Sequence, residues 1–386
     1  MHANPRPRVF ATLPTIQSLT ILVLFAITAQ AGAQKLVTFD APNSSANPYQ
    51  GTEAAGINIW GTIVGDVTDS DGGVHGFART ADGKFTEFDV LGANPAPGYP
   101  CLYGLGGTCP TAISDLGVIV GFEGDANDVF HGFVRTPDGK ITVFDAPGAA
   151  TTPDAGLGTW AYSINNLGVV TGYYADANYV YHGYVRTPDG KITVFDDAAA
   201  GTGAYQGTFP ESINNLGAIA GWVTDENGFS HGTVRSAKGK ISTFDPPGDA
   251  GSYYGVETAY INDLGLVGGG YWQGTGNVSY GFEGMAGGTI STFQIPDAGS
   301  APFDGAYVSA INMEGAMTGY VTDSNVENHS FVRSVNGKVA VFDVPGQELV
   351  PNSDFGSAGE AINALGVVAG RWHDTNAILH AYVWVP

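Results

Sequence analysis

The sequence predicts an all-β fold made of seven repeated units, each with four antiparallel strands. Three observations lead to this prediction. A glycine pattern recurs about every fifty residues, each repeat contains strand-like segments joined by tight turns, and the two ends of the chain carry complementary parts of one repeat. A period in this range is typical of propellers and solenoids.

The repeat is centred on an Ile-Asn step, which is Ile-Ser in the second repeat. Glycines stand six residues before, four after and eight after the isoleucine in all seven repeats. Glycine at a turn supplies a positive φ, and glycine within a strand allows another backbone to approach closely. The seven isoleucines are Ile57, Ile113, Ile164, Ile213, Ile261, Ile311 and Ile362.

The third repeat shows the predicted strands most clearly. Segments rich in β-branched and aromatic residues alternate with turns rich in Asn, Asp, Gly and Pro, which is the pattern that hairpins require. No segment has a sustained apolar period of 3.6 residues, so almost no helix is expected after the N-terminal segment. The four predicted strands span 160–164, 169–174, 181–186 and 191–196.

The chain ends indicate how the fold closes. The last repeat stops after its third strand, at 380–384, and the segment 35–40 matches the fourth strand at 191–196. Three strands from one end and one from the other complete the seventh unit and remove exposed strand edges. The prediction is therefore a seven-bladed β-propeller of four-stranded antiparallel blades, closed by an N-terminal strand that completes the last blade. An open superhelix is the alternative.

The first 33 residues have the features of a secretory signal. Arg6 and Arg8 precede a short apolar run at 19–27, and Ala31-Gly32-Ala33 fits a cleavage site. We therefore expect a signal peptide at 1–33 and a single propeller domain at 34–386, with no membrane span after processing and a secreted product, extracellular or periplasmic. Cys101 and Cys109 both fall in a predicted loop between repeats, and in an oxidising compartment they are expected to form a local disulfide.

The chain is strongly acidic, with a formal net charge of −22 at pH 7. Such a surface repels nucleic acid and anionic lipid, whose phosphates carry the same sign. It is compatible with neutral glycans, basic protein partners or cations. We expect a monomer that binds no nucleic acid.

A His-Gly-aromatic triplet recurs in the predicted third strand, downstream of Ile-Asn-x-x-Gly-x-x-x-Gly. With this triplet, the chain resembles the bacterial extracellular repeat family named for His-Ala-Phe, here with Gly favoured at the middle position. The resemblance covers all seven repeats and implies an exported repeat protein of a family without an assigned activity; it carries over no catalytic residue. The triplets are His75-Gly76-Phe77, His131-Gly132-Phe133, His182-Gly183-Tyr184 and, with Ala, His380-Ala381-Tyr382.

The repeated histidines are interpreted as structural. With a tight turn after the third strand, each His lies nearly opposite an Asp at the end of the fourth strand. In repeat five Tyr280 replaces the His and Gln294 replaces the Asp, as a cross-strand hydrogen bond would require. A ring of metal-binding histidines is the alternative. Two such pairs are His131 with Asp145 and His182 with Asp196.

The turn after the second strand carries a recurring Asp-x-Asn or Asp-x-Asp. Carboxylate and amide oxygens of this kind can bind calcium, although they also cap turns through their own backbone hydrogen bonds. If calcium binds, the expected ligands are Asp69 with Asp71 and Asp225 with Asn227. No other cofactor is expected, and no catalytic motif is present. His373 lies outside the repeat pattern and is interpreted as an exposed loop residue.

The predicted blade topology places short, uniform turns on one face and long, varied inter-blade loops on the other. Function concentrates where loops vary on a fixed scaffold. We therefore expect a binding or scaffold propeller that contacts a glycan or a protein through the long-loop face. The alternatives are a propeller enzyme, a lyase or glycoside-acting, with a central carboxylate site, and a structural envelope component.

Aromatic residues on the long-loop face are the candidate binding residues, since aromatic rings stack on sugars and anchor protein partners. The alternative is that many of them are buried between blades. The candidates are Trp160, Tyr205, Phe209, Tyr253, Tyr254, Phe303 and Phe355.

Overall fold

The computed structural model describes residues 34–93, 101, 106–152, 157–248, 255–347 and 355–386. These residues belong to one compact unit, Gln34–Pro386. The predicted signal peptide lies outside the described residues. As expected, the described chain is all-β: it contains 28 strands and one short 3₁₀ helix, η2 (Gly274–Gly276). No described helix is long and apolar enough to cross a membrane.

The strands follow the predicted repeats in order, four to each. Repeat one contains β2 (Thr52–Ile57), β3 (Ile63–Thr68), β4 (Val74–Arg79) and β5 (Phe85–Phe88). Repeat two contains β6 (Gly107–Ile113), β7 (Ile119–Gly124), β8 (Val129–Arg135) and β9 (Ile141–Phe144). Repeat three contains β10 (Leu157–Ile164), β11 (Val170–Ala175), β12 (Tyr181–Arg186) and β13 (Ile192–Phe195). Repeat four contains β14 (Gly207–Ile213), β15 (Ile219–Thr224), β16 (Ser230–Arg235) and β17 (Ile241–Phe244).

The remaining repeats have the same composition, with the last one drawing on both chain ends. Repeat five contains β18 (Val256–Ile261), β19 (Leu266–Gln273), β20 (Val278–Met285) and β21 (Ile290–Phe293). Repeat six contains β22 (Gly305–Ile311), β23 (Met317–Thr322), β24 (Asn328–Arg333) and β25 (Val339–Phe342). Repeat seven contains β26 (Ser357–Ile362), β27 (Val368–His373), β28 (Leu379–Val385) and β1 (Lys35–Phe39).

Within each repeat the strands pair antiparallel in sequence order, but some repeats are also joined to their neighbours. Short parallel pairs link a third strand to the next first strand, as between Tyr181 of β12 and Gly207 of β14. Such links merge several repeats into sheets of 12 and 8 strands, while repeats one and seven form sheets of four. At Gly207 φ is 136°, and a Cβ would collide with the Tyr181 carbonyl, so glycine is required for this approach.

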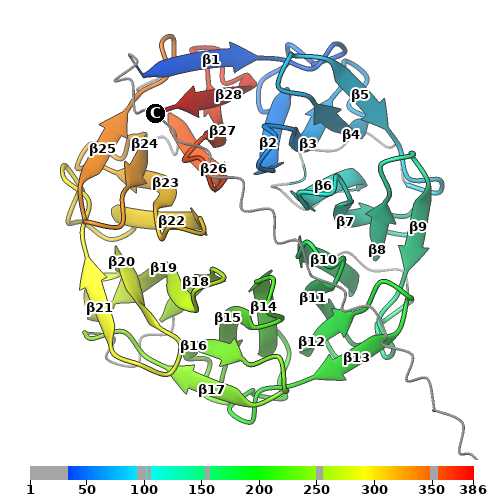
Figure 1. The fold of residues 1–386 in the computed structure, drawn as a ribbon, viewed down its shortest axis with the longest axis vertical. Coiled ribbons are helices and arrows are strands. Elements are labelled where there is room, and N and C mark those ends of the chain that lie inside the picture. Colours follow the sequence, from blue (N-terminus) through cyan, green and yellow to red (C-terminus); the bar gives the residue numbers. More distant parts are fainter. Residues whose placement is uncertain (1–33, 94–100, 102–105, 153–156, 249–254, 348–354) are drawn as a thin grey trace, which may run out of the picture. The chain divides into compact units, whose positions relative to one another are not determined.

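The repeats succeed one another around a common centre, and the succession returns to its start (Figure 1). Each repeat contacts the next, and repeat seven contacts repeat one through β26, β27 and β28 against β2. β1 pairs antiparallel with β28, with Lys35 opposite Val385 and Phe39 opposite Ala381. The N-terminal strand therefore occupies the fourth-strand position of repeat seven, as the sequence predicts.

Phe39 in β1 packs like the fourth-strand phenylalanines of other repeats. The guanidinium of Arg79 lies over the Phe39 ring at 4.4 Å, as Arg186 lies over Phe144 at 4.8 Å. The Phe39 ring also contacts Phe77 of β4, with ring centroids 6.5 Å apart. β1 therefore joins repeat seven to repeat one through the same aromatic contact that joins other successive repeats.

The asparagine of the Ile-Asn step links the turns of neighbouring repeats. Asn165 Nδ2 donates to the Asn214 carbonyl at 3.0 Å, and its Oδ1 accepts the Leu167 and Val169 amides within its own turn. The same link runs from Asn363 to the Asn58 carbonyl at 3.0 Å, across the chain ends. In repeat two the side chain is Ser114, whose shorter hydroxyl accepts the Val118 amide in its own turn. The asparagine side chain therefore stabilises its own turn and holds it against the turn of the next repeat.

Candidate functional site

The recurring histidines are held between two carboxylates. His131 Nδ1 lies 2.7 Å from Asp145, and its Nε2 lies 3.8 Å from Asp125. His182 makes the corresponding contact with Asp196 at 3.0 Å. These are the expected cross-strand pairs. In repeat five, Gln294 instead donates to the Ser279 carbonyl, so a different hydrogen bond replaces the His–Asp pair.

The candidate calcium ligands lie in the turns after the second strand. Asp69 Oδ1 accepts the amides of Asp71 and Gly73, at 2.9 and 2.8 Å. Asp225 Oδ1 accepts the Asn227 amide at 2.8 Å, and Asp225 Oδ2 accepts the Asn227 side-chain amide at 3.2 Å. These oxygens therefore serve the turn in the manner of an Asx-turn.

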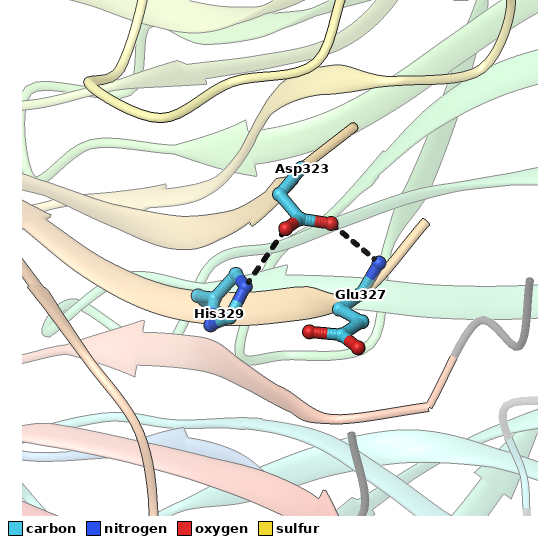
Figure 2. Close-up of side chains that lie close together, drawn as sticks. All are labelled: Asp323, Glu327 and His329. Carbon is cyan, nitrogen blue, oxygen red and sulfur yellow. Dashed lines mark hydrogen bonds and ion pairs between the residues drawn. The ribbon is translucent and has the colours of Figure 1, made fainter. Parts of the chain in front are cut away.

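One group of three potential metal ligands occurs within the described residues: Asp323, Glu327 and His329, whose ligand atoms lie within 4.8 Å of one another (Figure 2). Asp323 Oδ1 accepts the Glu327 amide at 3.0 Å, and His329 Nδ1 is bonded to Asp343 at 2.6 Å. The Asp and His belong to the repeated arrangement, and Glu327 is the addition specific to repeat six. This group was not among the candidates from the sequence.

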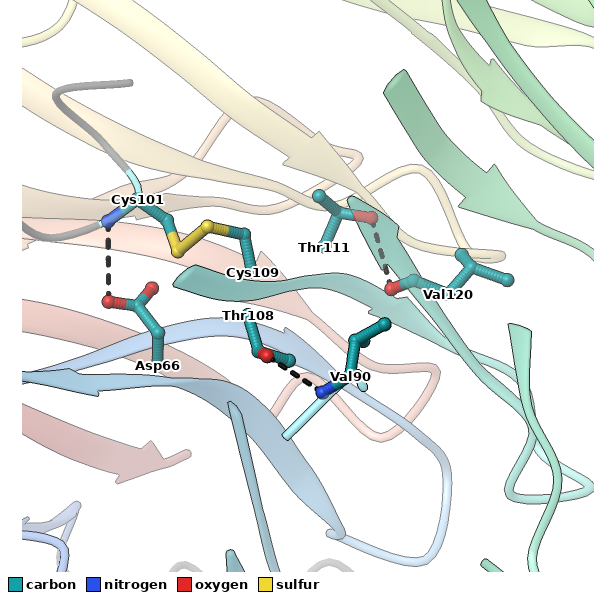
Figure 3. The surroundings of a disulfide bond; sticks show 7 residues. All are labelled: Asp66, Val90, Cys101, Thr108, Cys109, Thr111 and Val120. Carbon is teal, nitrogen blue, oxygen red and sulfur yellow. Dashed lines mark hydrogen bonds between the residues drawn. A yellow bond between two sulfur atoms is a disulfide. The ribbon is translucent and has the colours of Figure 1, made fainter. Parts of the chain in front are cut away.

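Cys101 and Cys109 form the expected disulfide, with their Cα atoms 5.5 Å apart (Figure 3). Both were expected in a loop between repeats, but Cys109 is a buried residue of the first strand of repeat two, β6. The Cys101 amide donates to Asp66 Oδ2 at 3.4 Å. The disulfide therefore ties the connection between repeats one and two to the inner strands.

The repeats differ most clearly at one cross-strand pair of positions on their two inner strands. The first member stands two residues after the repeat's first glycine, and the second faces it on the next strand. The pairs are Glu53 with Asp66, Cys109 with Phe122, Trp160 with Tyr173, Phe209 with Trp222, Tyr307 with Tyr320 and Ala358 with Arg371. One part of the circle is therefore aromatic and another is charged.

Two cavities are lined by these inner-strand residues. The first, of about 410 Å³, includes Trp272, Phe303 and His373. The second, of about 460 Å³, is lined by residues that include the disulfide and the carboxylates of several repeats. Both cavities share Glu257, Tyr307, Tyr320 and Arg371 in their walls. The two cavities therefore adjoin along a common wall.

The first cavity lies toward the predicted long-loop face. Phe303 belongs to the connection between repeats five and six, and Thr322 and Asn328 flank the second-to-third turn of repeat six. A separate, smaller cavity of about 190 Å³ lies among the Ile-Asn turns, on the short-turn face. The first cavity thus occurs on the side where the sequence places the varied loops.

Arg371 is the one cationic side chain among the described residues that line the two large cavities. Its Nε lies 3.1 Å from Glu53 and 2.8 Å from Glu360. Burial raises the pKa of Glu53 to about 7, although Arg371 opposes the shift. Burial also raises the pKa of Asp66, and the neighbouring Glu53 adds to the effect. The single positive charge of Arg371 therefore balances only part of the negative charge that these buried carboxyl groups carry when ionised.

Three of the cavity carboxylates stand at β-bulges. The register shifts at Glu211 in β14, at Glu257 in β18 and at Glu360 in β26. Bulges re-aim side chains and are common beside functional sites. Burial raises the pKa of Glu211 to about 8 and that of Glu257 to about 7. Glu211 is also held in place by the Trp222 indole and the Ala259 amide, at 3.2 and 2.9 Å.

His373 ends β27 and lines the first cavity. The sequence suggested an exposed loop residue, but the side chain is buried and packs against Phe355 with ring centroids 4.8 Å apart. Its Nε2 has no hydrogen-bond partner within the described part of the chain. Burial lowers the pKa of His373 to about 4, and the nearby Arg371 adds to the shift. The imidazole is therefore neutral at neutral pH.

The predicted aromatic binding residues differ in their exposure. Trp160 and Phe209 are buried, and Phe209 stacks on Trp222 with ring centroids 3.8 Å apart. Tyr205 and Phe303 are exposed, by 67% and 55%. Phe355 is half-buried against Tyr49 and His373. Tyr253 and Tyr254 lie outside the described residues. Among these candidates, Phe303 lines a cavity, while the buried pair serves packing between strands.

We expect the protein to become less stable as the pH rises from about 5.5 to 8.5. The pKa values of Glu53, Glu211 and Glu257 are raised by burial, so the folded state holds more protons than the unfolded state across this range. The pKa of His131 is raised by its bond to Asp145, and that stabilisation is also lost as the imidazole deprotonates.

Thermal unfolding followed by circular dichroism should show the melting temperature falling by several degrees between these pH values. Glu257→Gln removes one titrating carboxyl and should flatten the profile. A melting temperature that rises over the range would contradict the assignment of these buried acids. His373 acts in the opposite direction, because its lowered pKa costs stability only as the pH falls from about 6.5 toward 4.

No family model matches the chain, and no curated protein matches it. Among solved structures, it is similar to the fungal lectin of Aleuria aurantia, described as a six-bladed β-propeller, with 12% identity, a TM-score of 0.37 and coverage of 82% of this chain and 96% of the lectin. A second structure of this lectin, in complex with Fucα1-6GlcNAc, gives 15% identity, a TM-score of 0.42 and coverage of 78% and 96%.

Puromycin hydrolase is similar with 13% identity and a TM-score of 0.52, over 86% of this chain and 52% of the hydrolase. The chain therefore spans about half the length of that enzyme. At such identities only the fold is shared, and the likeness to the lectins is too distant to indicate a ligand for this chain.

Proposed function

We propose that residues 34–386 form a closed seven-bladed β-propeller that binds a glycan on its long-loop face. The circular succession of contacts, the pairing of β1 with β28 and the Asn363–Asn58 link support closure over an open superhelix. The observation that carries the function is the pair of adjoining cavities, which combine aromatic walls with buried hydrogen-bonding groups. Such concave, largely pre-formed sites are typical of ligand binding.

The chemistry of the cavities favours a neutral, hydroxyl-rich ligand. Trp272, Tyr307 and Tyr320 offer ring surfaces, and carboxyl groups offer hydrogen bonds. Arg371 is already engaged by Glu53 and Glu360, so an anionic ligand would meet excess negative charge. This charge balance supports a glycan over a phosphate-bearing partner, in keeping with the net charge of −22.

The cellular setting we propose is extracellular or periplasmic. The disulfide is consistent with an oxidising compartment. The signal-like N-terminus and the resemblance to the His-Ala-Phe repeat family support the same location. We propose membership of that family and a monomeric state on the sequence pattern alone. Calcium remains an optional ligand in this proposal, outside the glycan site.

The binding role can be tested with two aromatic residues at equivalent positions. Phe303 and Tyr205 each stand two residues before a repeat's first glycine, both have positive φ, and both are exposed. Phe303 lines the first cavity and contacts Trp272, whereas Tyr205 packs on Tyr179 and lines none of the described cavities. We expect Phe303→Ala to weaken glycan binding about tenfold, a loss of about 1.4 kcal/mol.

A glycan array followed by calorimetry with the best ligand provides the measurement. Tyr205→Ala is the matched control and should bind within about twofold of the unchanged protein, because a residue outside the site contributes little to affinity. Equal losses in both variants would move the site away from the first cavity. The absence of any glycan ligand for the unchanged protein would refute the proposed function.

A glycoside-acting enzyme or lyase is the second candidate. Its supporting observation is that Glu53, Glu211 and Glu257 come from three repeats and line one cavity, with pKa values raised to about 7, 8 and 7. A raised carboxyl pKa is what a general acid needs, and a pair of carboxylates is what glycosidases use. Product formation from oligosaccharides that is lost in Glu257→Gln would favour this candidate over simple binding.

A further inference from the structure

His373 occupies a position where five of the other repeats carry a small residue and repeat five carries Trp272. The last residue of the second strand is Thr68, Gly124, Ala175, Thr224 and Thr322 in repeats one, two, three, four and six. Only repeat seven has an imidazole at this position. The blade fold therefore does not require His373, and its presence at a cavity wall needs another explanation.

One ring nitrogen of His373 has no hydrogen-bond partner among the described residues. The residue is only 3% exposed, it lines the cavity of about 410 Å³, and its Nε2 is buried without a hydrogen-bond partner in the described chain. Buried polar groups are nearly always hydrogen-bonded, so such an atom indicates a missing partner. Glu53, whose Oε1 lies 3.1 Å from Arg371 Nε, likewise has a buried Oε2 with no partner among the described residues.

The surroundings define which partner fits His373. Arg371 is bonded to Glu53 and Glu360, so no free cation is present among the described wall residues to hold an anion. The imidazole is neutral, because burial and Arg371 disfavour its protonation. A neutral imidazole nitrogen either donates or accepts, depending on the tautomer, and a hydroxyl can satisfy it in both cases.

The size and walls of the cavity restrict the ligand further. A volume of about 410 Å³ is near the lower end of small-molecule sites, which span about 300–1,000 Å³. Phe303, Trp272 and Tyr307 supply aromatic surface beside the imidazole. We infer that the first cavity is the subsite for one neutral sugar ring and that His373 Nε2 hydrogen-bonds one of its hydroxyls. This inference rests on the proposed glycan-binding function and assigns its specificity to a residue.

The test compares two variants and a set of simple sugars. Isothermal titration calorimetry is run with the methyl glycosides of glucose, galactose, mannose and fucose, and with methyl glucuronide as the anionic analogue. We expect methyl glucuronide, or the uronic acid that corresponds to the best-binding sugar, to bind at least tenfold more weakly than that neutral sugar. His373→Leu should weaken the neutral sugar about tenfold, and His373→Gln should retain binding within about threefold, because its amide restores the hydrogen bond.

Monodeoxy forms of the best sugar identify the hydroxyl. One of them should bind the unchanged protein about tenfold more weakly, yet bind His373→Leu as well as the parent sugar does. Melting temperatures control for folding, and both His373 variants should melt within a few degrees of the unchanged protein.

The outcomes separate the two claims. If Phe303→Ala loses affinity while His373→Leu binds normally, the role of His373 is wrong and the glycan site stands. Equal binding of an anionic sugar overturns the neutral-ring assignment. If no sugar binds the unchanged protein at all, the proposed function fails and the inference falls with it.

Discussion

Arg371→Met is expected to lower the free energy of unfolding by about 3–5 kcal/mol at pH 8, the range found when one partner of a buried ion pair is removed. The substitution leaves Glu53 and Glu360 without the guanidinium that lies 3.1 and 2.8 Å from them. The loss should be smaller at pH 5, because Glu53, with a pKa raised to about 7, is then protonated and needs no cation. Urea denaturation at the two pH values measures both quantities.

A triple variant separates lost charge balance from lost packing. Arg371→Met combined with Glu53→Gln and Glu360→Gln removes the uncompensated charges and should recover more than half of the loss at pH 8. If the single variant loses less than about 1 kcal/mol, which is the size expected of an exposed ion pair, Arg371 does not hold the buried acids. An equal loss at pH 5 and pH 8 would also contradict the account.

Phe39→Ala is expected to cost about 2–4 kcal/mol, close to the effect of truncating a large core side chain. Phe39 lies in the N-terminal strand, but its ring packs against Phe77 and Phe85 of repeat one and lies under Arg79. The loss arises because this contact joins the first and last repeats. Chemical denaturation provides the measurement.

Phe144→Ala is the matched control, since Phe144 makes the corresponding contact with Tyr184 and Arg186 in the middle of the chain. The two variants should lose similar amounts of stability. A cost below about 0.5 kcal/mol for Phe39→Ala, which is typical of a surface position, would mean that the N-terminal strand does not close the fold.

The strands and their pairing could be predicted because the repeat constrains them several times over. The Ile-Asn turn, the glycines and the fourth-strand match at 35–40 recur at fixed offsets, and the structure uses each of them. The His131–Asp145 pair followed from hairpin register alone. The link from Asn165 to the Asn214 carbonyl did not follow from the pattern, because spacing along a chain does not say which neighbouring turn a side chain reaches.

The candidate site was harder to predict, because it lies where the repeat varies. Trp160 and Phe209 stand two residues after a glycine and are buried, whereas Tyr205 and Phe303 stand two residues before one and are exposed. The offset from the glycine therefore distinguishes buried from exposed aromatic residues, and the prediction of binding residues did not use it.

The charged and polar wall residues were missed for the same reason. Glu53, Arg371 and His373 stand at inner-strand positions where the residue type varies from repeat to repeat, and they line the cavities. Comparing each inner-strand position across the seven repeats would have singled them out. Their burial and their unpartnered atoms, however, depend on the packing of neighbouring repeats and could not be read from one sequence.

We propose that the ligand binds in the cavity between repeats five, six and seven on the long-loop face. Hydrogen–deuterium exchange of the protein with and without its best glycan locates the bound ligand. We expect protection on binding to be concentrated in peptides covering 303–322 and 355–373, with little change in the Ile-Asn turns of repeats two to four. Protection centred on those turns, around Ser114, Asn165 and Asn214, would place the ligand on the opposite face and contradict the account.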